Sequence, residues 1–98
     1  MSSENQIKVK IRLFATLRDV FNTSEVELSL DTTPTITGLF EVLCDSSKRR
    51  RMLFDRSGNI RSHVKILKNG RNIDFISGKD TQLADGDVVA VFPPIGGG

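Results

Sequence analysis

Apolar and polar residues alternate along two early stretches of the chain. From residue 7 to residue 13, apolar and basic side chains alternate without a break, which is typical of a strand with one buried face. Residues 25–30 alternate in the same way. The stretch 14–21 between them lacks this alternation and is predicted to be an irregular connection or a short turn of helix. Because the two stretches are close in sequence, we expect them to pair as a hairpin with a wide loop.

A helical pattern follows residue 35. Apolar residues recur with the spacing of one helix face, at Ile36, Leu39, Phe40, Leu43 and Cys44. Thr35 is the expected N-cap, but Gly38 occupies the position where a capping box has Glu or Gln. The helix is predicted to end near residues 46–47, and residues 48–55 are expected to form a second short helix.

Turn signals and short apolar runs divide the second half of the chain. Residues 63–67 are strand-like, and Asn69-Gly70 separates them from a predicted return strand at 72–75. Asn-Gly is a strong hairpin signal because both residues accept positive φ angles. The run 88–92 is apolar throughout, which predicts a strand buried on both faces at the centre of a sheet.

This order of elements predicts an α+β domain. The simplest packing is one mixed sheet of about four or five strands on one main helix, with the last strand beside the first. That arrangement is the β-grasp, or ubiquitin-like, fold. We place the domain at residues 7–92, with a disordered N-terminal tail at 1–6 and an extended C-terminal tail at 93–98.

Composition limits the function classes. The 98 residues are 38% hydrophobic and 27% charged, which suits one domain with its own core. No apolar run approaches the roughly 20 residues of a membrane span, so no membrane association is expected. The net charge is +2, although ten of the 14 Lys and Arg residues lie between Lys48 and Lys79. Without Trp, Tyr or a known motif, no nucleic-acid partner is predicted.

Most side chains that carry chemistry have simple structural explanations. Cys44, the single cysteine, falls on the apolar face of the predicted helix and is expected to be a core thiol. One thiol also favours a reducing compartment, and a cytoplasmic location is the expectation. His63 is expected near a strand start, and Asp85 and Asp87 in a turn rather than at a metal. The run Lys48–Arg51 is predicted to be a solvated helix face, with a partner surface as the alternative.

The most informative segment is Pro93-Pro94-Ile95-Gly96-Gly97-Gly98. Proline cannot donate a hydrogen bond to a sheet, so the pair ends the last strand and stiffens the chain beyond it. Glycine has no side chain to obstruct a narrow channel in a partner protein. A stiff base with a slender tip would deliver the α-carboxylate of Gly98 into such a channel. A frayed end or a cloning remnant is the alternative, which Pro-Pro directly after a buried strand disfavours.

The chain resembles the MoaD family of sulfur carriers, the small subunit of molybdopterin synthase, in four places. Residues 9–15 with Leu17-Arg18-Asp19 resemble the family's first strand and the stretch after it, residues 35–43 its helix, and Asn69-Gly70 the turn after its third strand. The most specific match is the closing stretch, Leu83-x-Asp85-Gly86-Asp87-x-Val89-x-x-Phe92-Pro93-Pro94-x-x-Gly97-Gly98. This family is grouped with ThiS and the archaeal ubiquitin-like modifiers.

The resemblance implies a sulfur-carrier cycle whose catalytic groups belong to partners. An E1-like, MoeB-type activating enzyme would use ATP to adenylate the Gly98 carboxylate, and a persulfide would convert it to a thiocarboxylate. A MoaE-like large subunit would receive the tail and pass the sulfur to a pyranopterin precursor of molybdopterin. The chain itself would be a non-catalytic subunit that binds no cofactor and no metal.

The resemblance also assigns residues to these steps. The residues implied are those of the tip, Gly96, Gly97 and Gly98, and those of the partner-binding base, Phe14, Phe92, Pro93 and Pro94. Gly96 departs from the family pattern, which has another residue before Gly-Gly. This third glycine supports an alternative function, a ubiquitin-like modifier joined to lysines through Gly98. A carrier for another sulfur pathway is a further alternative.

Overall fold

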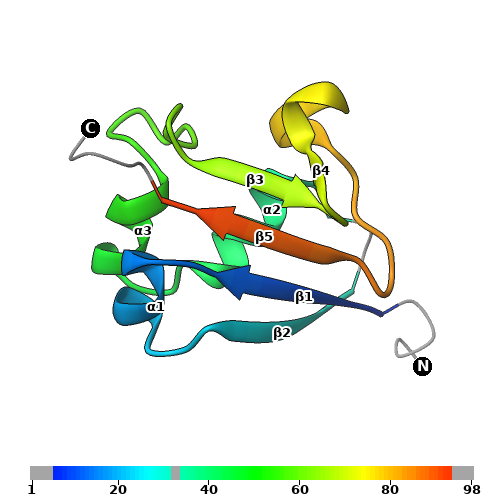
Figure 1. The fold of residues 1–98 in the computed structure, drawn as a ribbon, viewed down its shortest axis with the longest axis horizontal. Coiled ribbons are helices and arrows are strands. Elements are labelled where there is room, and N and C mark those ends of the chain that lie inside the picture. Colours follow the sequence, from blue (N-terminus) through cyan, green and yellow to red (C-terminus); the bar gives the residue numbers. More distant parts are fainter. Residues whose placement is uncertain (1–5, 32–33, 94–98) are drawn as a thin grey trace.

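The computed structural model describes residues 6–31 and 34–93 of the chain. Within these residues, five strands form one mixed sheet in the order β2-β1-β5-β3-β4 (Figure 1). The strands are β1 (Ile7–Leu13), β2 (Glu25–Leu30), β3 (Lys65–Lys68), β4 (Arg71–Asn72) and β5 (Val88–Phe92). The helices are α1 (Thr16–Phe21), α2 (Ile36–Leu43) and α3 (Ser47–Leu53), with two 3₁₀ turns, η2 (Ile73–Phe75) and η3 (Gly78–Asp80).

The first and last strands lie side by side in the middle of the sheet. β1 pairs with β5 in parallel, from Lys10↔Val88 to Leu13↔Val91, and with β2 in the predicted antiparallel hairpin. On its other side, β5 pairs with β3 in antiparallel orientation. Parallel neighbours need a crossover connection, and α2 lies within this one, behind the sheet in Figure 1. The predicted β-grasp fold is confirmed.

The core lies between one face of the sheet and the helices. The alternate residues of β1 and β5 that point inward are completely or almost completely buried: Val9, Ile11, Leu13, Val89 and Val91. They belong to one cluster with the apolar face of α2, as its helical spacing predicted. The Thr35 hydroxyl accepts a hydrogen bond from the Gly38 amide at 3.2 Å, which confirms the N-cap.

Two helix boundaries differ from the prediction. α2 ends at Leu43, a few residues early, because Cys44 leaves the helical conformation with ψ at 84°. The next helix begins at Ser47 rather than 48, because the Ser46 hydroxyl caps it by accepting a hydrogen bond from the Arg49 amide at 3.2 Å. A capping side chain therefore set the start of α3, and the backbone conformation of Cys44 set the end of α2.

The predicted strands around the Asn69-Gly70 turn are also shifted. β3 begins at Lys65 rather than 63, because a hydrogen bond from the Val64 amide to the Arg61 carbonyl closes a turn before it. β4 is confined to Arg71 and Asn72, and the return strand predicted at 72–75 is wrong beyond this point. The Asn72 side chain accepts a hydrogen bond from the Asp74 amide at 2.9 Å, which turns the chain into η2. This turn allows Ile73 to enter the core.

Two turns at one end of the sheet are held together by side chains. Asn69 and Gly70 have φ angles of 51° and 84°, as the Asn-Gly signal predicted. The Asp87 carboxylate accepts hydrogen bonds from the Ala84 amide at 2.8 Å and from the Asn69 side chain at 2.9 Å. Asp85 accepts one from the Lys8 amide at 2.8 Å. The predicted turn role of both aspartates is therefore confirmed.

A helix that crosses a membrane must be long and mostly apolar. Among the described residues, no helix has the length and apolar character that crossing a bilayer requires.

Candidate functional site

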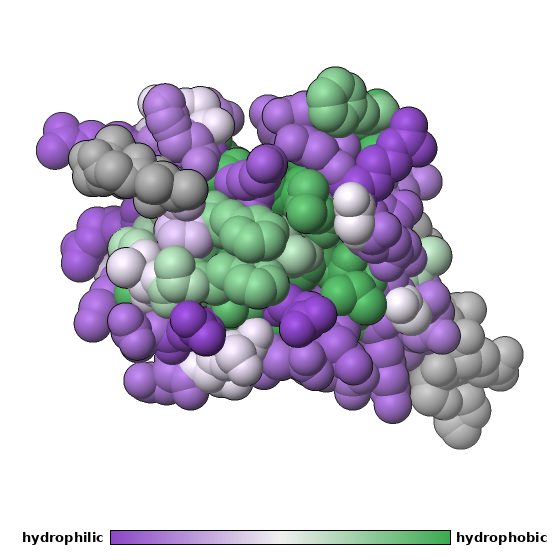
Figure 2. Space-filling view, in the orientation of Figure 1, coloured by the Kyte–Doolittle hydropathy of each residue, from purple (hydrophilic) through white to green (hydrophobic). Residues whose placement is uncertain are grey.

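The face of the sheet opposite the helices carries an apolar patch. Five half-buried residues form it, and we call them the sheet patch: Phe14, Leu67, Val88, Ala90 and Phe92. Figure 2 shows apolar side chains gathered over the middle of this face, with hydrophilic ones around them. An apolar surface with a polar rim is typical of a protein–protein contact. The sheet patch is therefore the candidate partner-binding site.

Strand register explains why these side chains meet. Ala90 is opposite Arg12 on β1 and opposite Leu67 on β3, so alternate β5 residues point to the outer face between two neighbours. Val88 and Phe92 lie two residues away on the same face. The prediction that β5 is covered on both faces is wrong, because the described helices cover only the inner face. The apolar residues on its outer face are those of the sheet patch.

Phe14 and Phe92 are stacked at one end of the sheet patch. Their ring centroids are 4.3 Å apart and the ring planes differ by 10°. Phe14 follows β1 and Phe92 ends β5, so the parallel register carries the two residues to the same level of the sheet. The Arg12 guanidinium lies 5.9 Å from the centre of the Phe14 ring. These contacts pack two half-buried aromatic rings against each other on the outer face of the sheet.

A strained turn sets the position of Phe14. Ala15 has φ 54° and ψ −131°, and the Leu17 amide donates a hydrogen bond to the Phe14 carbonyl at 3.1 Å. These values match the second residue of a type II′ turn, a position that glycine normally occupies. The turn redirects the chain into α1 directly after Phe14. Non-glycine residues at positive φ cluster at functional sites, which agrees with the location beside the sheet patch.

The predicted tail residues are described only in part. Pro93 follows Phe92 directly, lies outside β5 and is buried. The structure therefore brings Phe14, Phe92 and Pro93 to the end of β5, as the partner-binding prediction requires. Pro94, Gly96, Gly97 and Gly98 lie outside the described residues, and their roles stay predictions.

Other candidate residues have structural surroundings. Cys44 is buried, as predicted for a core thiol, and burial raises its pKa to about 11. His63 is exposed in the turn before β3. Burial acts to raise the pKa of Asp87, but the hydrogen bonds from Ala84 and Asn69 and the Lys68 ammonium outweigh it and hold that pKa below its usual range. Across residues 6–31 and 34–93, no cluster of His, Cys, Asp or Glu has the arrangement of a metal site.

The sequence prediction missed three members of the sheet patch. The sequence pattern places Leu67, Val88 and Ala90 in strands and indicates no functional role for them. The available signal is the apolar character of both faces of β5, from which burial of both faces is predicted. A strand that is apolar on both faces is equally compatible with one core face and one partner-binding face.

Comparisons with known proteins agree with this architecture. The model of the ThiS family matches residues 11–98. The small archaeal modifier protein 3 of Haloferax volcanii is 33% identical over 92 residues, which cover 94% of this chain and 100% of that protein. A putative sulfur carrier protein of Archaeoglobus fulgidus is 28% identical over 91 residues, covering 92% of this chain and 98% of that protein.

A solved structure has the same arrangement of elements. It is described as a putative molybdopterin converting factor, subunit 1, from Pyrococcus furiosus. The sequence identity is 30%, the TM-score is 0.68, and the match covers 91% of this chain and 99% of that one.

Proposed function

The chain belongs to the ThiS family of ubiquitin-like sulfur carriers, and on this premise we propose that it acts as a small modifier and sulfur carrier through the carboxyl group of Gly98. The observation that carries the proposal is the stacked, half-buried pair Phe14 and Phe92 beside Pro93, where the chain leaves β5. A partner that docks on the sheet patch would have the glycine tail directed into its own active site. The described residues supply the docking surface, and the partner supplies the catalytic groups.

The proposed chemistry begins with activation of the carboxylate. In an E1-like enzyme, a Gly98 carboxylate oxygen attacks the α-phosphorus of ATP, and pyrophosphate leaves. The resulting acyl adenylate is a far better acyl donor than the carboxylate, because AMP is a good leaving group. The terminal sulfur of a persulfide then displaces AMP to form an acyl disulfide. A second thiol attacks the inner sulfur, which forms a disulfide and releases the thiocarboxylate. Alternatively, a lysine amine attacks the acyl adenylate, AMP leaves, and an isopeptide bond forms.

Protein modification is the use that the comparisons support best. The Haloferax volcanii relative is named a small archaeal modifier protein and is matched over its whole length. The Archaeoglobus fulgidus relative, named a putative sulfur carrier, supports the thiocarboxylate branch. Both branches share the adenylate, so one protein can serve both. Glycine has no side chain to obstruct a partner's channel, so the three glycines at the end of the sequence suit either reaction.

Sulfur donation to molybdopterin is the second candidate function. The Pyrococcus furiosus structure, described as a putative molybdopterin converting factor, supports it. In this role a MoaE-like large subunit would bind the sheet patch and take up the tail. The thiocarboxylate sulfur would then be transferred to a pyranopterin precursor.

Mass spectrometry of the protein from its native host tests the proposal. We expect part of the protein to carry a thiocarboxylate, seen as one oxygen replaced by sulfur, and other proteins to carry Gly98 linked to lysine. Deletion of Gly97 and Gly98 together, which removes the Gly-Gly end, should abolish both signals while leaving thermal unfolding unchanged. Persistence of both signals after the deletion would contradict the proposal. The absence of isopeptide-linked Gly98, with the thiocarboxylate present, would favour the molybdopterin role.

A further inference from the structure

An open cavity rich in arginine lies between α3 and the segment that follows it. Its volume is about 440 Å³, and four of its lining residues are Arg50, Arg51, Arg56 and Arg61. We call it the arginine pocket. Phe54, which is almost fully buried, also contributes to its lining, and the acidic lining residue is Asp55. The basic run Lys48–Arg51 therefore contributes two arginines to a concave surface and is more than a solvated helix face.

Two arginines of the run stabilise the fold. The Arg50 guanidinium donates to both Glu41 oxygens, at 2.7 and 3.3 Å, and lies 4.3 Å from the centre of the Phe54 ring. Arg49, outside the pocket, pairs with Asp45 at 2.9 Å and lies 4.9 Å from the centre of the Phe21 ring. Their charges are balanced within the chain.

The other pocket arginines are available to a ligand. Among the described residues, the side chains of Arg51 and Arg56 have no hydrogen bond or ion pair. Arg61 uses its Nε to donate to the Arg51 carbonyl at 2.8 Å, which leaves its terminal nitrogens. Asp55 is occupied by its own turn, because one carboxylate oxygen accepts from the amides of Ser57 and Asn59. The pocket therefore keeps an excess of positive charge.

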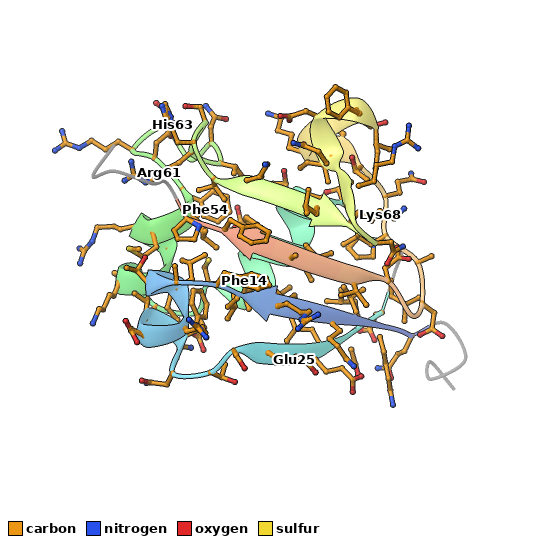
Figure 3. All side chains as sticks on the ribbon, viewed as in Figure 1. Phe14, Glu25, Phe54, Arg61, His63 and Lys68 are labelled. Carbon is orange, nitrogen blue, oxygen red and sulfur yellow. The ribbon has the colours of Figure 1, made fainter. Side chains whose placement is uncertain are left out.

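The location of the pocket connects it with the sheet patch. α3 lies at the end of the molecule where β5 ends (Figure 1). Figure 3 shows Phe54 and Arg61 at this same end. A protein that binds the sheet patch and receives the tail is therefore positioned to reach the arginine pocket.

We infer that the arginine pocket binds acidic side chains of the enzyme that activates the tail, as a second contact beside the sheet patch. Guanidinium groups match carboxylates with paired hydrogen bonds, so Arg51, Arg56 and Arg61 suit Asp or Glu on that enzyme. A nucleic acid is disfavoured, because the Phe54 ring is buried and already contacted by Arg50, so the pocket offers no exposed ring for base stacking. The inference rests on the proposed function. Both branches of that function begin with adenylation of the Gly98 carboxylate, so the activating enzyme is the partner that would contact the arginine pocket in either branch.

A charge-reversal experiment tests this second contact. The assay is ATP–pyrophosphate exchange by the activating enzyme of the same host, with the concentration of this protein varied at low salt. The test variant is Arg51→Glu with Arg56→Glu. The control is Arg71→Glu with Lys79→Glu, which makes the same charge change at exposed positions outside the arginine pocket. We expect the half-saturating concentration to rise about tenfold for the test variant and about twofold or less for the control. The maximal rate should be unchanged, and added salt should reduce the difference.

The outcomes separate this inference from the proposed function. An unchanged half-saturating concentration, or a loss of maximal rate alone, would overturn the second contact while the function stands. No exchange with the unaltered protein would overturn both. Binding of a labelled single-stranded RNA that the test variant loses, with activation unchanged, would assign the pocket to nucleic acid instead. If the Glu variant does not fold, Arg51→Gln with Arg56→Gln serves the same purpose and should give a smaller rise.

Discussion

The ring of Phe14 lies flat against the ring of Phe92, with the two centroids 4.3 Å apart, at the point where β5 ends. One ring comes from the residue after the first strand and the other from the last residue of the final strand. The parallel pairing of β1 with β5 is what brings them together. A surface that neither segment could form alone is therefore built beside the exit of the tail.

Removal of either ring should weaken partner binding without unfolding the protein. For Phe14→Ala or Phe92→Ala, we expect the half-saturating concentration in the activation assay to rise by about tenfold or more, because aromatic anchors carry much of the energy of an interface. The core residues of the inner face remain in place, so the fold should persist. Phe75→Ala is the matched control, since Phe75 is 76% exposed and lies outside the sheet patch. Equal effects of Phe14→Ala and Phe75→Ala would contradict a docking role.

Relief of the turn at Ala15 should stabilise the protein. Ala15→Gly places glycine at φ 54° and ψ −131°, where it is unstrained. We expect the free energy of unfolding in urea to rise by about 1 kcal/mol, after the greater entropy of glycine in the unfolded chain is subtracted. Ala90→Gly is the opposite control, because Ala90 lies within β5 and glycine there should cost about 0.5–1 kcal/mol. A decrease in stability for Ala15→Gly would show that the turn is not strained.

Asp87 should stabilise the fold in a pH-dependent way. Asp87→Asn removes a charged acceptor from the Ala84 amide and the Asn69 side chain, and we expect a loss of about 1–2 kcal/mol near neutral pH. The folded pKa of Asp87 lies below its unfolded value, so the unfolded state binds more protons in acid. The stabilisation is complete above the unfolded pKa, about 3.9, and is lost as pH falls through the lower folded pKa.

Urea unfolding of the Asp87→Asn variant at several pH values measures this effect. Asp74→Asn provides the control, because Asp74 is exposed and its carboxylate accepts no hydrogen bond among the described residues. Its effect should stay within about 0.5 kcal/mol. A difference for Asp87→Asn that does not change between neutral and acid pH would contradict the role of the charge.

Cys44 should be unreactive in the folded protein. Cys44 is 7% exposed, and burial raises its pKa to about 11, so little thiolate exists at neutral pH. We expect iodoacetamide to modify the native protein at least about a hundredfold more slowly than the urea-unfolded protein. Mass spectrometry over time gives both rates. Native modification as fast as that of a free thiol would reopen a nucleophilic role for Cys44.

Local patterns in the sequence were sufficient for much of the fold. Alternation over residues 7–13 and 25–30 specified two strands and their inner faces, because side chains of a strand point to opposite sides in turn. Thr35 specified a helix start through its hydroxyl, and Asn69-Gly70 specified a turn through backbone conformation. Each signal acts within a few residues, so it can be seen in one stretch of sequence.

The tertiary structure decided which apolar and charged residues were left for partners. Whether the second face of β5 is covered depends on where the helices lie, and the helices of the described residues lie on the inner side. The stacking of Phe14 on Phe92 depends on strand order, and the division of the basic run depends on which arginines meet Glu41 or Asp45. By itself, the sequence determined most of the strands, helices and turns, and the glycines at its C-terminal end. The sheet patch and the arginine pocket arose only from the fold, because residues far apart in the chain meet through register and packing.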